Sequence, residues 1–161
     1  MNIFFIADTH FGHRNICKYR PFNSVEEHDE TIIEKWNAVV HKKRSIVYVL
    51  GDFMFRDDNR DILSIIYKLN GKIKIVTGNH DYMPYINELA KSRFIELERG
   101  IMKKYGYWLS HCPMHPQELR GHKNIHGHVH SKSVPDERYI NVSCDTINYT
   151  PISLEQIREL K

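Results

Sequence analysis

Polar side chains able to hold a metal ion recur in short clusters along the sequence. Seven of them carry a carboxylate, amide or imidazole donor, namely Asp8, His10, Asp52, Asn79, His111, His128 and His130. Asp8 and His10, like His128 and His130, stand two positions apart, and in an extended chain such residues project to the same side. Seven donors exceed the four of a closed zinc site, so they predict two ions ~3.5–4 Å apart with a shared ligand. A carboxylate is the natural bridge.

The types of donor predict which metals would bind. Cys112 follows His111 directly, but alternation along a strand points it to the opposite side, so we expect a core thiol there. With no thiolate among the donors, the oxygen and imidazole set favours manganese first, with iron, zinc or nickel as alternatives. Copper(I) and iron–sulfur chemistry are disfavoured.

Short apolar runs precede these donors and predict the elements that position them. Residues 2–7, 46–50 and 72–77 are typical of strands, and each run ends at a donor cluster. Between them, a capping-box start at Ser24 predicts a helix over 25–42, and a second helix runs from an N-cap at Asn59 toward Gly71. Later segments predict strands and a capped closing helix that ends at Leu160, and their ranges are 94–97, 101–104, 107–110, 139–142 and 153–160.

This order of elements predicts the fold class. Strands that alternate with helices, followed by a strand-rich half, indicate a layered α/β fold with parallel pairing among the first three strands. In such sheets ligands bind beyond the carboxyl ends of the strands, which is where the donors fall. The length of 161 residues, 41% of them hydrophobic, fits a single domain over 1–161.

Charge and cysteine content limit the partners and the compartment. The 23 basic residues are nearly balanced by 20 acidic ones, so the net charge of +3 does not indicate a nucleic-acid partner. The longest apolar run, 3–7, is far shorter than the ~20 residues that span a bilayer, and we expect no membrane partner. Three cysteines without CxxC spacing favour reduced thiols and a cytoplasmic location.

The clusters, taken in order, closely resemble the motifs of a known superfamily. They read Asp8-Thr9-His10, Gly51-Asp52, Gly78-Asn79-His80-Asp81, His111 and Gly127-His128-Val129-His130. They resemble those of the calcineurin-like metallophosphoesterases from residue 3 to about residue 130. The extension of the first motif through His13, with Arg20-Pro21-Phe22 downstream, looks like the small bacterial and phage phosphoesterases. The resemblance implies a four-layer α/β/β/α metallophosphoesterase sandwich with mixed sheets.

The resemblance also implies a role for each donor. One ion would be held by Asp8, His10 and His130, the other by Asn79, His111 and His128, with Asp52 as the bridge. A hydroxide shared by two divalent ions would attack phosphorus in line with the leaving oxygen. His80 would stabilise the transition state or protonate the leaving group, and Asp81 would orient its imidazole.

Residues around these motifs can be interpreted either as substrate contacts or as ordinary loop and surface residues. His13, Arg14 and Asn15 follow the first motif closely enough to contact substrate, although a polar loop would need such residues in any case. For residues 18–20, which include Arg20, a solvated loop is the favoured interpretation. Three further histidines, expected to support the ligands or lie at the surface, are His115, His122 and His126.

The predicted function is hydrolysis of a phosphomonoester or phosphodiester in a small-molecule or nucleotide-like substrate. A phosphoprotein phosphatase is disfavoured, because Gly51-Asp52 is not followed by that class's Asp-Arg-Gly and the third motif ends in Asp81 rather than Glu. One alternative is a nuclease acting on ends or short oligonucleotides, and another is a non-catalytic scaffold of the same fold. Substrate identity and oligomeric state stay open.

Overall fold

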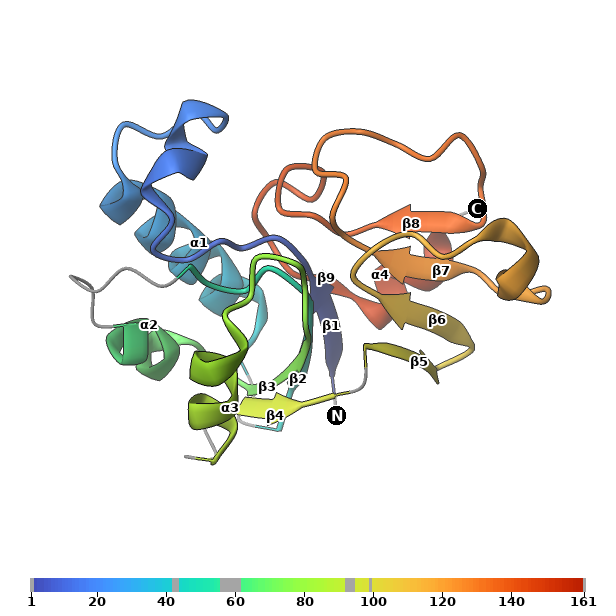
Figure 1. Ribbon diagram of the computed structural model, residues 1–161, viewed down its shortest axis with the longest axis horizontal. Coiled ribbons are helices and arrows are strands. Elements are labelled where there is room, and N and C mark those ends of the chain that lie inside the picture. The colour runs from blue at the N-terminus through green and yellow to red at the C-terminus, as the bar shows by residue number, and fades with distance from the viewer. Residues whose placement is uncertain (1, 42–43, 56–61, 92–94, 99, 161) are drawn as a thin grey trace.

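Two mixed β-sheets form the centre of the structure (Figure 1). The computed structural model describes residues 2–41, 44–55, 62–91, 95–98 and 100–160. In the five-stranded sheet the spatial order is β4 (Ile95–Leu97), β3 (Lys72–Val76), β2 (Ile46–Leu50), β1 (Ile3–Ile6) and β9 (Ile152–Ser153). Strands β1 to β4 pair in parallel, and β9 pairs antiparallel with β1. The parallel run brings the carboxyl ends of β1, β2 and β3 to one edge.

The four-stranded sheet supplies the other side of that edge. Its order is β5 (Ile101–Lys104), β6 (Tyr107–Ser110), β7 (Asn124–His126) and β8 (Tyr139–Asn141). Strands β5 and β6 form an antiparallel pair, whereas β6, β7 and β8 run parallel. The segments that follow β6 and β7 therefore also leave the sheet at a common end.

Helices connect the strands, and side-chain caps mark where α1 and α4 start. They are α1 (Val25–Val39), α2 (Ile62–Lys68), α3 (Met83–Lys91) and α4 (Leu154–Glu159), with short 3₁₀ turns η1 (Arg14–Lys18) and η2 (Pro116–Leu119). The Ser24 hydroxyl accepts the backbone N–H of Glu27 at the start of α1. At α4 the reciprocal capping box of Ser153 and Gln156 is complete.

The two faces of the five-stranded sheet contribute to two separate hydrophobic cores. Phe4 and Ile6 of β1 pack with side chains from α1, α2 and α3, including the fully buried Trp36. Ile3 and Phe5 face the other way and pack against the four-stranded sheet and α4. Because successive strand residues alternate between these cores, β1 is buried on both faces and its position is strongly fixed.

Most elements predicted from the sequence are confirmed. The α/β fold with two mixed sheets is present, and the strands predicted at 2–7, 46–50 and 72–77 are found within one residue of those bounds. The helix predicted over 25–42 ends at Val39, because Val40 leaves helical geometry while its N–H still bonds the Trp36 carbonyl. The predicted N-cap Asn59 lies outside the described residues. The sequence analysis missed α3, β7 and β9.

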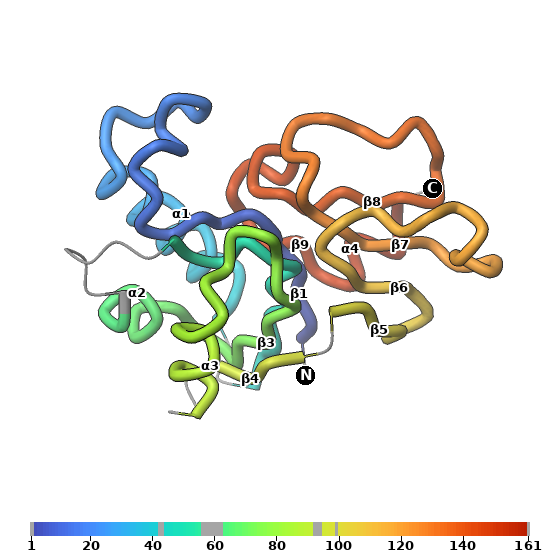
Figure 2. The backbone as a smooth tube through the Cα atoms, in the orientation of Figure 1, coloured from blue at the N-terminus to red at the C-terminus, as the bar shows by residue number. Residues whose placement is uncertain are grey.

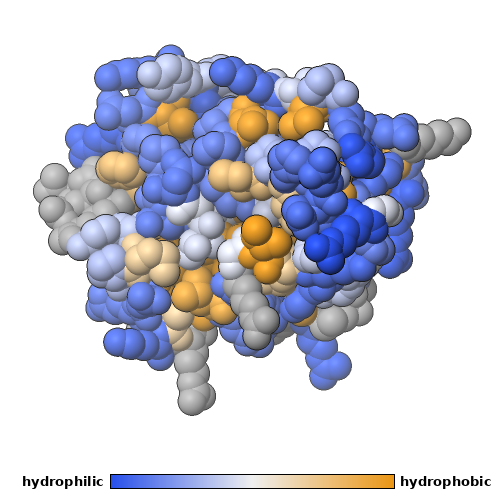
Figure 3. Space-filling model, turned by 45° about the vertical axis from the view of Figure 1, so that its right-hand side comes forward, coloured by the Kyte–Doolittle hydropathy of each residue, from blue (hydrophilic) through white to orange (hydrophobic). Residues whose placement is uncertain are grey.

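On the face drawn in Figure 3, hydrophobic residues form separate patches among hydrophilic ones. No described helix combines the length and apolar character needed to cross a bilayer.

Candidate metal centre

The predicted donors come together where the strand ends of the two sheets meet. Asp8, Asp52 and Asn79 follow β1, β2 and β3, and His111 and His128 follow β6 and β7. Figure 2 shows the loops after β1, β3 and β7 converging in the middle of the molecule. The backbone N–H of His128 donates to Asp8 Oδ2 at 2.9 Å, a contact that joins residues from the two sheets.

The backbone at this edge is unusual at the donor residues themselves. Asp8, His10, Asp52, His128 and His130 have φ angles of 55°, 49°, 51°, 71° and 50°. Side chains of L-residues crowd the backbone in this left-handed region, so such angles cost free energy unless the surroundings enforce them. Their concentration at one site indicates that ligand geometry has been favoured over backbone relaxation.

Glycine precedes several donors because the chains approach each other too closely for a side chain. Gly51 has φ +85°, and a Cβ there would lie 2.2 Å from His111 Nδ1. A Cβ on Gly127 would lie 2.4 Å from the Ala7 Cβ and 2.6 Å from Asp8 Oδ2. These two glycines therefore allow the sheets to bring their ligands within reach of one another.

The first cluster consists of Asp8, His10 and His130, each with a ligand atom within 4.8 Å of the others. Asp8 and His10 are 0% and 2% exposed. Asp8 Oδ2 accepts the Ser143 hydroxyl at 2.6 Å, whereas Asp8 Oδ1 and His10 Nε2 have no hydrogen-bond partner among the described residues. Burying such atoms without a partner is costly, and a cation between them would satisfy both. The cluster therefore fits a divalent metal ion.

An ion pair between the buried Arg20 and the half-buried Asp145 supports this cluster from behind. Asp145 Oδ2 accepts His130 Nδ1–H at 2.9 Å, which leaves Nε2 of that ring for a metal. Arg20 donates two hydrogen bonds to Asp145, at 2.8 and 3.0 Å, and one to the Asp8 carbonyl at 2.7 Å. The prediction of a solvated loop at Arg20 is wrong, since this residue is only 4% exposed.

Sequence reasoning missed Asp145 altogether, although a signal was available. This carboxylate closely follows β8, just as the predicted ligands follow their strands. Burial raises the pKa of Asp145, but hydrogen bonds from His130 and Arg20 outweigh it and hold the pKa below its ordinary value. Burial, together with the charge of Arg20, lowers the pKa of His10 to about 2 and keeps that imidazole neutral.

The second cluster consists of Asn79, His111 and His128. Asn79 Oδ1 lies 2.9 Å from His111 Nε2 and 3.0 Å from His128 Nδ1, and those two nitrogens are 3.2 Å apart. His111 Nδ1 faces the Leu50 carbonyl at 2.9 Å and must donate to it, so Nε2 carries the lone pair that points into the cluster. Unlike the first cluster, this one has two exposed members, Asn79 and His128.

Asp52 lies between the two clusters. Its Oδ2 is 3.7 Å from His10 Nε2 and 3.5 Å from His111 Nε2, and the residue is 1% exposed. Its Oδ1 accepts the backbone N–H of His80 at 2.8 Å, which fixes the carboxylate. This is the position that a shared ligand needs.

The third motif places His80 and Asp81 differently from each other. The exposed imidazole of His80 lies 5.6 Å from that of His10, measured between ring centroids. Asp81 is buried, and its carboxylate accepts the backbone N–H groups of Gly78, Asp52 and Phe53. No hydrogen bond joins Asp81 to the His80 ring in the part of the chain described. Asp81 therefore holds the loops after β2 and β3 together, which corrects the expectation that it orients His80.

The predicted substrate-contact residues separate in the structure. The half-buried His13 lies beside the first cluster, 5.5 Å from the His10 ring, and stacks on Phe55 at 4.3 Å with an interplanar angle of 12°. Arg14 and Asn15 are exposed on η1, where Arg14 lines a separate hollow with Cys17.

The three further histidines singled out in the sequence lie outside the two clusters. His126 is buried on β7 with Nδ1 2.9 Å from the Gly127 carbonyl, and His115 caps η2. His122 is half-buried in the turn after η2.

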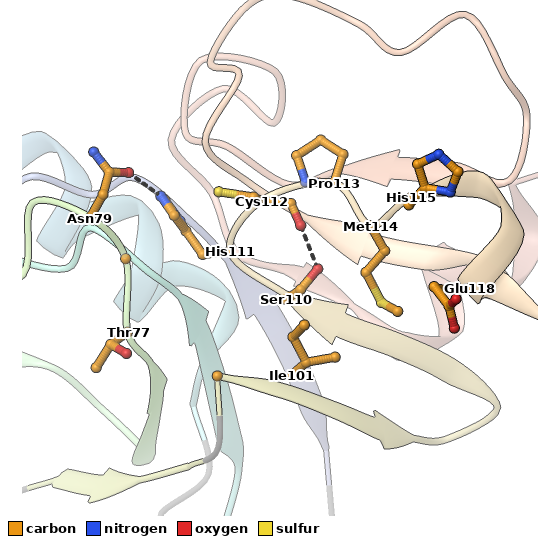
Figure 4. A pocket seen from close by; sticks show the side chains of 12 residues that line it. Thr77, Asn79, Ile101, Ser110, His111, Cys112, Pro113, Met114, His115 and Glu118 are labelled. Carbon is orange, nitrogen blue, oxygen red and sulfur yellow. Dashed lines mark hydrogen bonds between the residues drawn. The ribbon is translucent and has the colours of Figure 1, made fainter.

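An open cavity of about 760 Å³ adjoins the second cluster (Figure 4). Residues that line it include Asn79, Ile101, His111, Cys112 and Met114. The prediction of a core thiol at Cys112 is wrong, because this residue is exposed. The prediction failed because β6 ends at Ser110, so strand alternation no longer applies at Cys112.

Comparison with known proteins agrees with this geometry. Residues 1–156 match the family model described as calcineurin-like phosphoesterase. The chain belongs to this family. A family member of this kind hydrolyses phosphoesters with divalent metal ions, and the two clusters supply candidate ligands for them.

Similar proteins come from distant sources. An uncharacterised protein of Methanocaldococcus jannaschii is 38% identical over 98% of this chain and 90% of its own length. The gene 66 protein of Mycobacterium phage L5 is 35% identical over 50% of this chain and 40% of its own.

Two crystal structures share the fold. One is a protein of unknown function from Aquifex aeolicus, with a TM-score of 0.78, 29% identity and 99% coverage of both chains. The other is the Pseudomonas putida nuclease MPE, with a TM-score of 0.54, 22% identity, and coverage of 80% of this chain and 60% of its own.

Proposed function

We propose that this calcineurin-like phosphoesterase is a binuclear metal-dependent enzyme that hydrolyses phosphomonoester or phosphodiester bonds in small-molecule or nucleotide-like substrates. The observation that carries the proposal is the position of Asp52, whose Oδ2 lies within 4 Å of donor nitrogens from both clusters. A buried carboxylate in that position suits a ligand shared by two ions. When bound, these ions would activate water and neutralise charge on the phosphoryl oxygens.

The side chains around the clusters have complementary roles. His80 is exposed, and its ring stands beside that of His10, so it is placed to donate a proton to a leaving oxygen. His13, held flat against Phe55, offers its ring on the same side of the site. The open cavity beside Asn79 and His111 gives room for the group attached to phosphorus.

The donor types support an initial choice of metal. Carboxylate and imidazole in the first cluster suit manganese, with iron, zinc or nickel as alternatives. The cytoplasmic location expected from the cysteine content stays a prediction.

The test is metal-dependent turnover. The purified protein is stripped with a chelator, manganese is restored, and hydrolysis of p-nitrophenyl phosphate is measured beside bis-p-nitrophenyl phosphate. Asp52→Ala should abolish turnover of either ester while the fold is retained. His80→Ala should reduce turnover by ~10²–10⁴-fold without changing metal content. Full activity in Asp52→Ala would refute the proposal.

Nuclease activity is the second candidate, and the shared fold with the Pseudomonas putida nuclease is what supports it. Cleavage of short oligonucleotides that falls as salt rises would indicate contacts to several phosphates. Absence of cleavage at low salt, with bis-p-nitrophenyl phosphate still hydrolysed, would restrict the enzyme to small substrates.

A further inference from the structure

Cys112 stands beside the second cluster, in the loop directly after β6. One ligand atom from each of His111, Cys112 and His128 lies within 4.8 Å of the other two. Figure 4 shows the Cys112 sulfur on the side of its loop that faces His111 and Asn79. Of the three cysteines, only Cys112 belongs to such a cluster in the described part of the chain.

Hydrogen bonds on both sides of Cys112 hold its loop in place. The Ser110 hydroxyl donates to the Cys112 carbonyl at 2.7 Å, and the backbone N–H of Met114 donates to Asn124 Oδ1 at 2.9 Å. Asn124 itself is fully buried, with its amide donating to the Trp108 carbonyl. The sulfur is therefore presented from a fixed backbone rather than from a free loop.

The second cluster is short of negative charge. Asn79, His111 and His128 are neutral donors when they bind a metal, and Asp52 would be shared with the other ion. A thiol that loses its proton to solvent as the metal–sulfur bond forms adds an anionic, polarisable donor at this position. Ligand atoms bound to one zinc ion lie roughly 3–4 Å apart. Three atoms that all lie within 4.8 Å of one another therefore need only a small movement to reach one ion.

We propose that Cys112 Sγ is a further ligand of the metal held by Asn79, His111 and His128. This inference rests on the proposed binuclear function and deepens it. Thiolate and imidazole together favour zinc, cobalt or iron over manganese, whereas the first cluster offers only oxygen and imidazole donors among its described members. The two positions of one site would then select different metals. Oxidation of Cys112 would weaken the second position and leave the first intact.

Cobalt(II) tests the inference without an activity assay, because a thiolate bound to Co²⁺ gives a near-ultraviolet charge-transfer absorption. The metal-free protein, Cys112→Ser and the matched control Cys17→Ser are titrated anaerobically with Co²⁺, and bound metal is counted separately. We expect the absorption to grow with the second ion in the parent and in Cys17→Ser, and to be missing in Cys112→Ser. Zinc and manganese compete for the position held by Asn79, His111 and His128. In Cys112→Ser the ratio of their affinities there should shift at least ~10-fold toward manganese.

The outcomes separate this inference from the function on which it rests. A charge-transfer absorption that persists in Cys112→Ser would overturn the inference. So would two bound Co²⁺ ions in the parent without the absorption, and the binuclear function would then stand. Binding of fewer than two Co²⁺ ions by the parent would overturn the binuclear function itself. Tight binding of the first ion by Cys112→Ser shows that the variant is folded.

Discussion

The two halves of the candidate site differ in what surrounds them. The half formed by Asp8, His10 and His130 is backed by the Arg20–Asp145 ion pair, and two of its three donors are buried. The other half, formed by Asn79, His111 and His128, faces solvent and the cavity lined by Cys112. Two of the three donors in the first half are buried, whereas two of the three in the second half are exposed.

This difference predicts that the two halves differ in metal affinity and in access to substrate. Donors that are already held in position lose little freedom when they bind an ion, so the enclosed half should bind its metal more tightly. The open half should exchange its metal more readily and meet the substrate first. Experiments that treat the halves separately can break or sharpen this comparison.

The largest effect is expected from removing one donor of each half in turn. His10→Ala and His128→Ala should each reduce phosphoester hydrolysis by ~10²–10³-fold or more, because charge stabilisation by one ion is lost. Their metal content should differ after gel filtration: His128→Ala keeps one tightly bound ion, and His10→Ala keeps none. Equal metal content in the two variants, measured by mass spectrometry, would contradict the tighter binding expected of the enclosed half.

The next effect concerns the ion pair behind the enclosed half. Arg20→Met should lower the free energy of unfolding by roughly 3–5 kcal/mol, because Asp145 then stays mostly buried without its cation. The matched control is Arg120→Met, which removes an exposed arginine paired with Glu118 and should cost about 1 kcal/mol or less. Urea unfolding of both variants makes the measurement, and similar losses would mean that the Arg20 pair is not structural.

A smaller effect, on metal affinity, is expected when the Asp145 carboxylate is replaced by an amide of the same size. In Asp145→Asn one carboxylate oxygen becomes an amide donor, which conflicts with donation from Arg20 or His130. The affinity for the first manganese ion should fall by ~10–100-fold, as it does when the partner of a metal-bound histidine is altered. Calorimetric titration should show the second binding event unchanged, and Asp136→Asn, remote from the clusters, serves as the control. A loss confined to the second event would reverse the assignment.

The smallest effect concerns the reactivity of two thiols, the exposed Cys112 beside the second cluster and the buried Cys144. In Cys17→Ser, we expect the exposed Cys112 to react with a maleimide at neutral pH, and Cys144 to stay unmodified. Burial raises the pKa of the Cys144 thiol to about 12, so the reactive thiolate is scarce there. Bound zinc should slow the labelling of Cys112. Mass mapping of the adducts distinguishes the sites, and modification of Cys144 in the folded protein would count against its burial.

The sequence predicts this site well wherever spacing carries the information. The carboxyl-end rule for parallel strands places Asp8, Asp52 and Asn79 at one edge, and the structure brings the other four predicted donors to them. Glycine before a donor is likewise visible in the sequence, although only the structure shows the close contact that requires it.

Long-range partners could not be read from local pattern. The partner of the buried Arg20 is Asp145, 125 residues away, and no residue pattern near Arg20 predicts that contact. The expectation of a core thiol at Cys112 came from strand alternation, which does not apply beyond the last residue of β6. The start of α3 did carry a local signal, since Pro84 stands at its second residue, a position that suits proline.

The hydrogen bonds of Asp8 have a consequence for how the protein survives metal starvation. Its Oδ2 accepts from His128 and Ser143, residues 120 and 135 positions away, so the donors exist as a site only while the two sheets are docked. An ion that binds the docked state alone adds about 4 kcal/mol of stability at a thousand times its dissociation constant. We therefore expect removal of metal to weaken the junction between the two sheets. A low concentration of free metal should then shorten the lifetime of the protein against proteases as well as lower its activity.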